Sequence, residues 1–228
     1  MEKCKARIDS VYNGSAVDGK GLRCVVFFTG CNMRCGFCHN PETWTEKGIE
    51  ITLSDLVAKI KRYKSYIKNG GVTLSGGEPF LQAGFCKELI KALHSEDISV
   101  IIETNGLICD VELIELCDGI RLDIKNQERD VDKRVFDFLD TCQQKDKFVT
   151  MTNVLVPALN DTHEKLSNLK SIKEKYSCIK EFKFLAFRKL CESKYARLNI
   201  PFSYEKYEEG TKADLQRAYE IVFDSKRD

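Results

Sequence analysis

Residues 23–39 read Arg23-Cys-Val-Val-Phe-Phe-Thr-Gly-Cys31-Asn-Met-Arg-Cys35-Gly-Phe-Cys38-His39. The stretch begins with a nearly continuous apolar run, Arg23–Phe28, which is typical of a strand buried on both faces of a parallel sheet. Three cysteines then follow within eight residues. Because reactive groups gather at the carboxyl ends of parallel strands, this junction predicts both the class of fold and the place of the functional site.

Short apolar runs alternate with helical segments along the rest of the chain. In Leu81–Leu93, the residues Leu81, Phe85, Leu89 and Leu93 recur at every fourth position and predict one apolar helix face. The alternation predicts an α/β fold, with parallel strands and helices outside them, that fits a closed or partial (β/α)6 barrel. The other expected strands are Val72–Ser75, Ser99–Thr104, Gly119–Ile124, Val149–Val156 and Phe182–Leu185, and the other expected helices are Thr52–Lys68, 111–117, 133–142, 162–176 and 211–223.

The composition is that of an ordinary globular protein. Of the 228 residues, 43% are hydrophobic and 31% are charged, and the net charge of +1 argues against nucleic-acid binding through a strong basic field. No apolar run approaches the ~18 residues of a membrane-spanning helix, and the N-terminus lacks the apolar core of a signal peptide. We therefore expect a cytoplasmic protein with a single domain over residues 1–228, in which 191–228 form a C-terminal excursion and helix. Within it, the polar and aromatic segment Cys191–Gly210 is expected to lie at the surface.

The chain contains 11 cysteines, an odd number in a chain without a secretion signal. A disulfide framework is therefore disfavoured, and metal binding or catalysis becomes the better interpretation of a tight cysteine cluster. Cysteines in apolar runs or helical segments are expected to be small buried hydrophobes. Such cysteines are Cys24, Cys86, Cys117 and Cys142.

The spacing C-x3-C-x2-C of Cys31, Cys35 and Cys38 lets all three thiolates point toward one metal centre. Three ligands are one fewer than a closed structural metal site uses. On a four-iron cluster this leaves one iron with an open coordination position, where a substrate can bind directly. The three cysteines are thus the expected metal ligands and the expected catalytic centre.

The residues alone leave three other interpretations of the cysteine cluster open. Cys35-Gly-Phe-Cys38-His39 matches the c-type haem attachment signature, but that chemistry belongs to exported proteins. His39 could complete a Cys3His zinc site, although the adjacent Cys38 and His39 fit poorly on one ion. The cysteines could also be redox-sensing thiols.

With its aromatic residue before the last cysteine, the cluster resembles the signature of the radical S-adenosylmethionine (SAM) superfamily. The chain is similar in particular to the activating enzymes of glycyl radical enzymes, especially the pyruvate formate-lyase type. Six motifs in the family's order carry this resemblance and cover most of the chain to about residue 190. They are Val17-Asp-Gly-Lys-Gly-Leu-Arg23, Phe28-Thr-Gly-Cys31 through Cys38-His-Asn-Pro-Glu-Thr-Trp44, Leu74-Ser-Gly-Gly-Glu-Pro79, Glu103-Thr-Asn-Gly106, Leu122-Asp-Ile-Lys125 and Val154-Leu-Val-Pro157.

The resemblance implies a SAM site at the mouth of a radical SAM partial barrel. It assigns the Gly-Gly-Glu stretch to the SAM amino group and the residues around the last cysteine to the adenine side. Asp123 and Lys125 lie two apart on a predicted strand and so point the same way. The residues that the resemblance places against SAM are Phe37, His39, Gly76, Gly77, Glu78, Thr104, Asp123, Ile124 and Lys125.

The chain departs from the family's pattern at several positions. The family commonly has Pro where Lys20 stands, and it has His where Arg188 stands, at a position that helps to hold SAM. An arginine is a candidate replacement because a guanidinium pairs well with a carboxylate. The family commonly has Asp where Glu103 stands, at a position linked to a monovalent cation, and the longer side chain of Glu103 disfavours that cation. No second cysteine cluster follows Trp44, unlike in the larger activating enzymes.

The resemblance implies a reaction and its partners. A reduced flavodoxin or ferredoxin supplies one electron to the cluster, SAM is cleaved, and a 5′-deoxyadenosyl radical takes a hydrogen from a glycine of a partner enzyme. The cofactors carry the radical chemistry, and the protein binds, orients and excludes water and oxygen. The alternatives are another small radical SAM enzyme, either a ribonucleotide reductase activator or a 7-carboxy-7-deazaguanine synthase, and a non-catalytic metal-binding module.

Overall fold

The computed structural model describes residues 4–223. The strands within them are β1 Lys5–Ser15, β2 Arg23–Phe28, β3 Ile49–Thr52, β4 Gly71–Gly76, β5 Val100–Thr104, β6 Gly119–Asp123, β7 Val149–Leu155 and β8 Ile179–Ala186. They follow the order β3-β1-β2-β4-β5-β6-β7-β8 in one sheet. β2 is parallel to β4, β4 to β5, and β7 to β8, whereas β1 is antiparallel to both β2 and β3. The antiparallel strands thus occupy one edge of a mainly parallel sheet.

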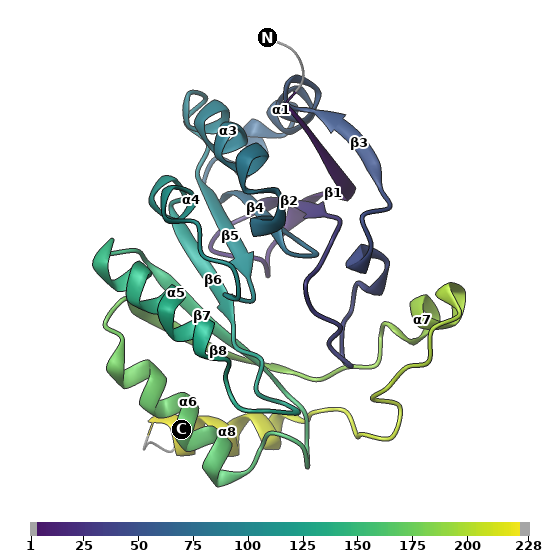
Figure 1. The fold of residues 1–228 in the computed structure, drawn as a ribbon, viewed down its shortest axis with the longest axis vertical. Helices are drawn as coiled ribbons and strands as arrows, with labels where there is room; N and C mark the ends of the chain where they lie inside the picture. Colours follow the sequence, from purple (N-terminus) through teal and green to yellow (C-terminus); the bar gives the residue numbers. More distant parts are fainter. Residues whose placement is uncertain (1–3, 224–228) are drawn as a thin grey trace. The chain divides into compact units, whose positions relative to one another are not determined.

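Helices connect the successive parallel strands, as Figure 1 lets the reader follow along the chain. Parallel neighbours need such crossovers because a short turn cannot return the chain to the same end of the sheet. The helices are η1 Pro41–Trp44, α1 Leu53–Lys61, α2 Lys64–Ile67, η2 Pro79–Gln82, α3 Ala83–His94, α4 Val111–Leu116, α5 Lys133–Gln144, α6 His163–Lys175, α7 Glu192–Leu198 and α8 Lys212–Phe223.

The chain divides into two compact units, and β6 runs from one into the other. The first unit contains the described residues up to Arg34, together with Asn40–Thr104 and Ile108–Arg121. The second contains Cys35–His39, Asn105–Leu107 and the described residues from Leu122 onward. The boundary therefore falls inside the cysteine motif, between Arg34 and Cys35.

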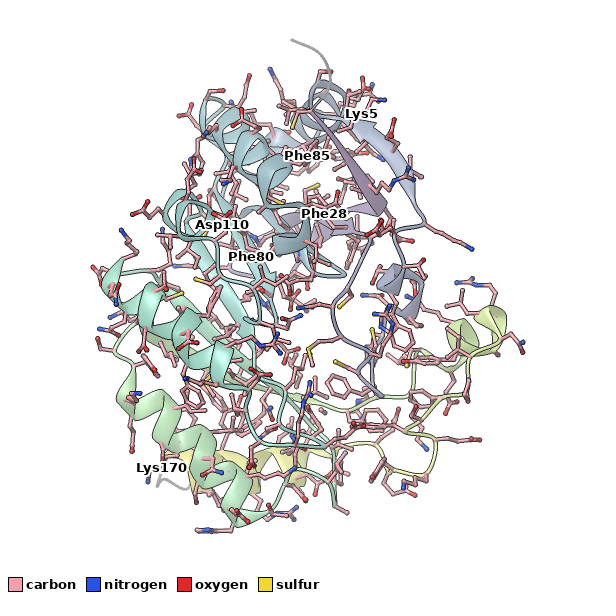
Figure 2. The ribbon with its side chains drawn as sticks, viewed as in Figure 1. Lys5, Phe28, Phe80, Phe85, Asp110 and Lys170 are labelled. Atoms are coloured by element: carbon pink, nitrogen blue, oxygen red, sulfur yellow. The ribbon has the colours of Figure 1, made fainter. Side chains whose placement is uncertain are left out.

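The core of the first unit includes a contact between α3 and the end of β2. Phe28 and Phe85 are buried, and their ring centroids lie 6.2 Å apart in an edge-to-face arrangement. Figure 2 shows Phe28, Phe80 and Phe85 gathered in this interior. Leu89 and Leu93 extend the same buried face of α3, whereas Leu81 lies in η2 and is 48% exposed. The expected apolar face is therefore confirmed from Phe85 onward and wrong at Leu81.

The second unit packs α6 and α8 beside each other, as Figure 1 shows. Aromatic residues of β8 form the contact with α8, since the rings of Phe184 and Tyr219 lie 5.2 Å apart and those of Phe182 and Phe223 lie 5.9 Å apart. The Tyr219 hydroxyl also accepts a hydrogen bond of 3.0 Å from the backbone amide of Phe184. The final helix thus shields one face of the strand at the end of the sheet.

All six strands expected from apolar runs are present, with shifts of a few residues at their ends. The expected helix Thr52–Lys68 is wrong as a single element, because the backbone tightens after Ile60 and the chain forms α1 and α2 separately. The amide of Tyr63 bonds to the carbonyl of Ile60 at 2.9 Å, a spacing of three residues that ends the α-helical ladder.

The sequence analysis missed β1, β3 and α7, and it also missed the short helix η1. β1 and β3 carry many polar residues and are largely exposed on one face, so they lack the continuous apolar signal. α7 lies within the segment Cys191–Gly210, and Tyr195 and Tyr204 of that segment are buried. The expectation of a surface excursion is therefore wrong for its aromatic side chains. None of the helices among residues 4–223 is long and apolar enough to cross a bilayer.

Replacing Phe85 by alanine is expected to lower the free energy of unfolding by about 3–5 kcal/mol, because the lost ring leaves a cavity beside Phe28. Phe148→Ala is the matched control, since that ring is 45% exposed; its cost is expected to stay below about 1 kcal/mol. Urea unfolding followed by circular dichroism measures both. Equal losses in the two variants would contradict the placement of Phe85 in the core.

Candidate active site

Cys31 follows β2 in the first unit, in a segment anchored by backbone hydrogen bonds. The amide of Gly30 bonds to the carbonyls of Thr43 and Thr45, both at 2.9 Å. Gly30 has φ of 89°, a conformation that glycine adopts without strain. The backbone amide of Met33 points to the Cys31 sulfur at 3.4 Å. Such an amide stabilises a thiolate more than a thiol, which suits a metal ligand.

Arg34 fixes the other end of this segment. Its guanidinium donates a 2.7 Å hydrogen bond to the Cys31 carbonyl and lies 5.5 Å from the centre of the Trp44 ring. η1, which ends at Trp44, thus supports the segment Cys31–Arg34 within the first unit. The family motif that ends at Trp44 therefore has a structural role in holding the chain around the first cysteine.

Gly76 and Gly77 let the turn after β4 lie directly on the end of β2. A side chain on Gly77 would come within 2.0 Å of the Gly30 carbonyl oxygen, and one on Gly76 within 2.3 Å of the Phe28 amide. The amide of Glu78 donates to that same Gly30 oxygen at 2.8 Å. These glycines therefore let the turn after β4 lie against the backbone that precedes Cys31.

Glu78 is fully buried, and its carboxylate has partners. Oε1 accepts hydrogen bonds from the Thr104 hydroxyl at 2.8 Å and from the Phe80 amide at 3.2 Å. A buried carboxylate is stable only when such donors compensate for lost water. The structure thus brings together Glu78 and Thr104, two residues that the sequence analysis selected from separate motifs.

Glu103 faces a buried arginine. Its carboxylate accepts a 2.7 Å hydrogen bond from Ser75, and its other oxygen lies 3.7 Å from Nε of Arg121, which is 6% exposed. The guanidinium already compensates for the carboxylate charge. The residues around Glu103 therefore do not fit the monovalent cation that the resemblance raises there.

Cys35 and Cys38 lie in the second unit, in a tight turn. The amide of Cys38 bonds to the carbonyl of Cys35 at 3.1 Å. Burial raises the pKa of the Cys35 thiol, and the nearby Lys125 ammonium opposes that rise. Phe37, between the two cysteines in sequence, is 7% exposed and lies with its ring centre 4.7 Å from Lys125 Nζ.

Asp123 and Lys125 form the ion pair that their spacing predicts. Lys125 Nζ donates to Asp123 Oδ2, while Asp123 Oδ1 is buried and has no partner among the described residues. Burial would lower the pKa of Lys125, but attraction to Asp123, Cys35 and Cys38 outweighs it and raises that pKa. The lysine is therefore a fixed positive charge near two thiols, and the buried Asp123 Oδ1 retains the capacity to accept a hydrogen bond.

Buried amides hold the backbone after β6. Asn153 donates to the Ile124 carbonyl at 2.7 Å and to Asn126 Oδ1 at 2.9 Å, and Asn160 donates to that same oxygen at 3.0 Å. The Ile124 amide bonds to the Thr152 carbonyl at 2.9 Å. The sequence analysis missed Asn126, Asn153 and Asn160. Three asparagines in or close after the expected strands were a signal that could have identified them.

His39 and Arg188 are connected through the backbone. Nε2 of His39 lies 2.9 Å from the Arg188 carbonyl oxygen, whereas the Arg188 guanidinium is half exposed and pairs with Glu209 at 3.4 Å. In the protein alone, the His39 ring thus ties the cysteine loop to the segment after β8. The charge of Arg188 is already shared with a surface carboxylate.

Sequence reasoning also missed two tyrosines of the segment Cys191–Gly210. Tyr195 and Tyr204 are 1% and 3% exposed. Burial raises the pKa of both hydroxyls. At Tyr195 the nearby Cys38 raises the pKa further, and at Tyr204 the hydrogen bond to Glu128 does so. The density of tyrosine and phenylalanine in this segment was the signal that could have identified them.

The donor set fits an iron–sulfur cluster with an open position. All eleven cysteines lie in the described residues and carry thiols rather than disulfides. No three His, Cys, Asp or Glu side chains in residues 4–223 are gathered as metal ligands in the protein alone. Cys31, Cys35 and Cys38 are each partly exposed, in contrast to the buried Cys24, Cys86, Cys117 and Cys142. Accessible thiols can bind metal, and the buried ones behave as packing residues, as expected.

Comparison with known proteins agrees with an iron–sulfur cluster in this chain. A family model described as "4Fe-4S single cluster domain" matches residues 17–118. The pyruvate formate-lyase-activating enzyme of Clostridium pasteurianum is 35% identical, over 86% of this chain and 88% of that protein. The chain belongs to the pyruvate formate-lyase-activating enzyme family. Its relative from Staphylococcus epidermidis is 33% identical over 96% of this chain and 95% of its own.

Solved structures agree on the fold. A radical SAM methyltransferase from Sphaerobacter thermophilus superposes with a TM-score of 0.62 at 16% identity, over 88% of this chain and 63% of that chain. The activating enzyme thus has the radical SAM type of partial (β/α)6 barrel. β2 and β4 through β8 supply its six strands, and β1 and β3 are additions at the edge.

Replacing Thr104 by valine is expected to lower the free energy of unfolding by about 1–3 kcal/mol, because the buried Glu78 carboxylate loses a donor. The control is Thr141→Val, whose hydroxyl bonds to the Asp137 carbonyl on α5; we expect a loss within about 0.5 kcal/mol. Thermal and urea unfolding measure the two. A neutral Thr104→Val variant would show that Glu78 does not depend on this hydroxyl.

Proposed function

We propose that this chain is a radical SAM activating enzyme that reductively cleaves SAM and generates a glycyl radical on a partner such as pyruvate formate-lyase. The observation that carries the proposal is the C-x3-C-x2-C loop directly after β2 in a member of this family. Three thiolates leave one iron of a [4Fe-4S] cluster open to a substrate. The family relationship then favours SAM as that substrate and a protein glycine as the final hydrogen donor.

Cys31, Cys35 and Cys38 are the proposed cluster ligands. When bound, the cluster and SAM supply the chemistry, namely one-electron cleavage of the S–C5′ bond and removal of a hydrogen atom from glycine. The chain's own part is to hold the thiols and to keep a positive charge close to them. Lys125 does this, since its raised pKa keeps it protonated throughout the physiological range.

The proposed SAM contacts divide by chemistry. Asp123 Oδ1 is an acceptor for an amino or hydroxyl group, and the Phe37 ring offers an apolar face for adenine. Arg188 can pair with a carboxylate only by exchanging its contact with Glu209. The other proposed contacts are His39, Gly76, Gly77, Glu78, Thr104 and Ile124.

The proposal includes the electron donor and the compartment. A reduced flavodoxin or ferredoxin is the proposed donor, as the family relationship implies. Cysteine-rich iron–sulfur proteins need a reducing environment, which favours the cytoplasm. We propose no role for nucleic acid or membrane in the reaction.

Alanine at any one of Cys31, Cys35 and Cys38 is expected to abolish the iron–sulfur absorption band after anaerobic reconstitution. Reductive SAM cleavage should fall by at least about 100-fold, because losing a ligand costs more than the roughly 10–100-fold of an outer-shell partner. Cys142→Ala, at a buried cysteine of α5, is the control that should keep both. A colourless zinc protein in the unsubstituted chain would contradict the assignment.

Mixing the reconstituted enzyme anaerobically with pyruvate formate-lyase, SAM and reduced flavodoxin is expected to give the electron spin resonance signal of a glycyl radical. A partner variant with alanine in place of the radical glycine is the control and should stay silent. Active SAM cleavage without a signal from any glycyl radical enzyme would point instead to a small-molecule substrate.

A further inference from the structure

We propose that Tyr204 is a positioning residue that holds the cysteine-bearing loop Cys35–His39, and that position 36 is glycine because the tyrosine ring occupies the space of a side chain. The inference deepens the proposed function, on which its consequence for the cluster rests. Its geometry lies wholly within the second unit.

The Tyr204 ring covers Gly36. A side-chain carbon on Gly36 would lie 2.2 Å from Cε1 and 2.4 Å from Cδ1 of Tyr204, far inside van der Waals contact. Gly36 is not one of the glycines with positive φ, so its backbone is open to other residues. Space, rather than backbone conformation, therefore requires glycine between the two cysteines.

The same ring joins the loop to the ends of two strands. Its centroid lies 5.8 Å from that of Phe37 and 5.9 Å from that of Phe187, which follows β8. Val156, which follows β7, belongs to the same buried cluster, and Cys35 packs against it. A cysteine of the proposed metal site thus rests on an apolar cluster of which Tyr204 is a part.

The Tyr204 hydroxyl fixes the ring's position. It donates a 2.9 Å hydrogen bond to Oε1 of Glu128, in the loop after β6. A hydrogen bond to a carboxylate is stronger than one between neutral groups. Tyr204 is 3% exposed, so this hydrogen bond compensates its hydroxyl for lost water. Tyr204 therefore connects the loop after β6, the ends of β7 and β8, and the cysteine turn.

This arrangement predicts a function for the segment Cys191–Gly210. A loop of Cys-Gly-Phe-Cys has few side-chain contacts of its own, and ligands must be held in place to bind a cluster well. Tyr204 supplies that support from a distant part of the sequence. Its loss should loosen Cys35 and Cys38 locally without unfolding the unit.

A double-mutant cycle on the full chain without metal tests this support directly. The rates of iodoacetamide alkylation of Cys35 and Cys38 are measured by mass spectrometry in Tyr204→Ala, Gly36→Ala and the double variant. We expect Tyr204→Ala to raise both rates about tenfold, and Tyr204→Phe about threefold, since only the hydrogen bond is lost. Gly36→Ala should raise the rates in the presence of Tyr204 and add nothing in its absence.

Tyr176 provides a matched control. It is 2% exposed, and its hydroxyl donates to Asp140 at the same 2.9 Å, but it caps α6. Tyr176→Ala and Tyr176→Phe should leave the alkylation rates of Cys35 and Cys38 unchanged, even where they lower the melting temperature. Gly84→Ala, at a glycine with open space around it, controls for the glycine substitution. Additive effects in the cycle, or equal effects of the Tyr176 variants, would overturn the proposal.

The reconstituted protein gives a second, spectroscopic readout. Tyr204→Ala is expected to change the electron spin resonance line shape of the reduced cluster and to release iron to a chelator about tenfold faster than Tyr176→Ala. An unchanged line shape and release rate would overturn the link to the cluster. If the unsubstituted chain assembles no cluster, the proposed function fails, and the thiol measurements still decide whether Tyr204 holds the loop.

Discussion

The contact between the end of β2 and the turn after β4 is the constraint on which the first unit's site depends. The Gly30 carbonyl accepts the Glu78 amide and leaves no room for a side chain at Gly77. The two backbone segments lie within hydrogen-bonding distance of each other, so Gly30, which precedes Cys31, is joined directly to the buried Glu78. The acid in turn is compensated by Thr104 from the next strand. The backbone before Cys31, the Glu78 carboxylate and the Thr104 hydroxyl are thereby linked by hydrogen bonds.

In the second unit, electrostatic attraction holds the residues around Cys35 and Cys38 in place. Lys125 is drawn toward Asp123 and two cysteine thiols, and these attractions outweigh the cost of its burial. A cluster bound by thiolates carries negative charge, so a fixed ammonium nearby compensates for it. One oxygen of Asp123 accepts a hydrogen bond from that lysine, and the other is buried without a partner among the described residues. The pair would therefore suit the metal ligands and the co-substrate that we propose for this site.

Aromatic packing completes the second unit's site and comes from late in the chain. The rings of Phe37, Phe187 and Tyr204 form a buried cluster against which Cys35 rests. Such rings supply large contact area and, at Tyr204, a polar edge that reaches a carboxylate. Tyr204 thereby brings the segment Cys191–Gly210 into contact with the cysteine turn, which is the contact that our proposal uses. At Glu103, in contrast, the buried Arg121 replaces an external positive charge with one that belongs to the chain.

Six strands, most of the helices and the cysteine motif could be predicted from the sequence. Apolar runs and the spacing of thiols are local, and each reports a local physical requirement. The same logic predicted that Asp123 and Lys125 would pair, because side chains two apart on a strand share a face. It failed for β1 and β3, whose exposed faces remove the apolar signal, and for the single helix Thr52–Lys68.

Only the tertiary structure decided which distant residues serve the site. Tyr204 lies over Gly36, more than 160 positions away along the chain, and Arg121 on β6 faces Glu103 on the neighbouring strand β5. Neither pairing leaves a mark in residue spacing, because long-range contacts depend on how strands and loops are placed in space and not on local pattern. The run from Cys31 to His39 thus located the metal site, and six motifs in the family's order were needed to predict its chemistry. The residues that pack against this run could be found only from packing, burial and charge in the folded chain.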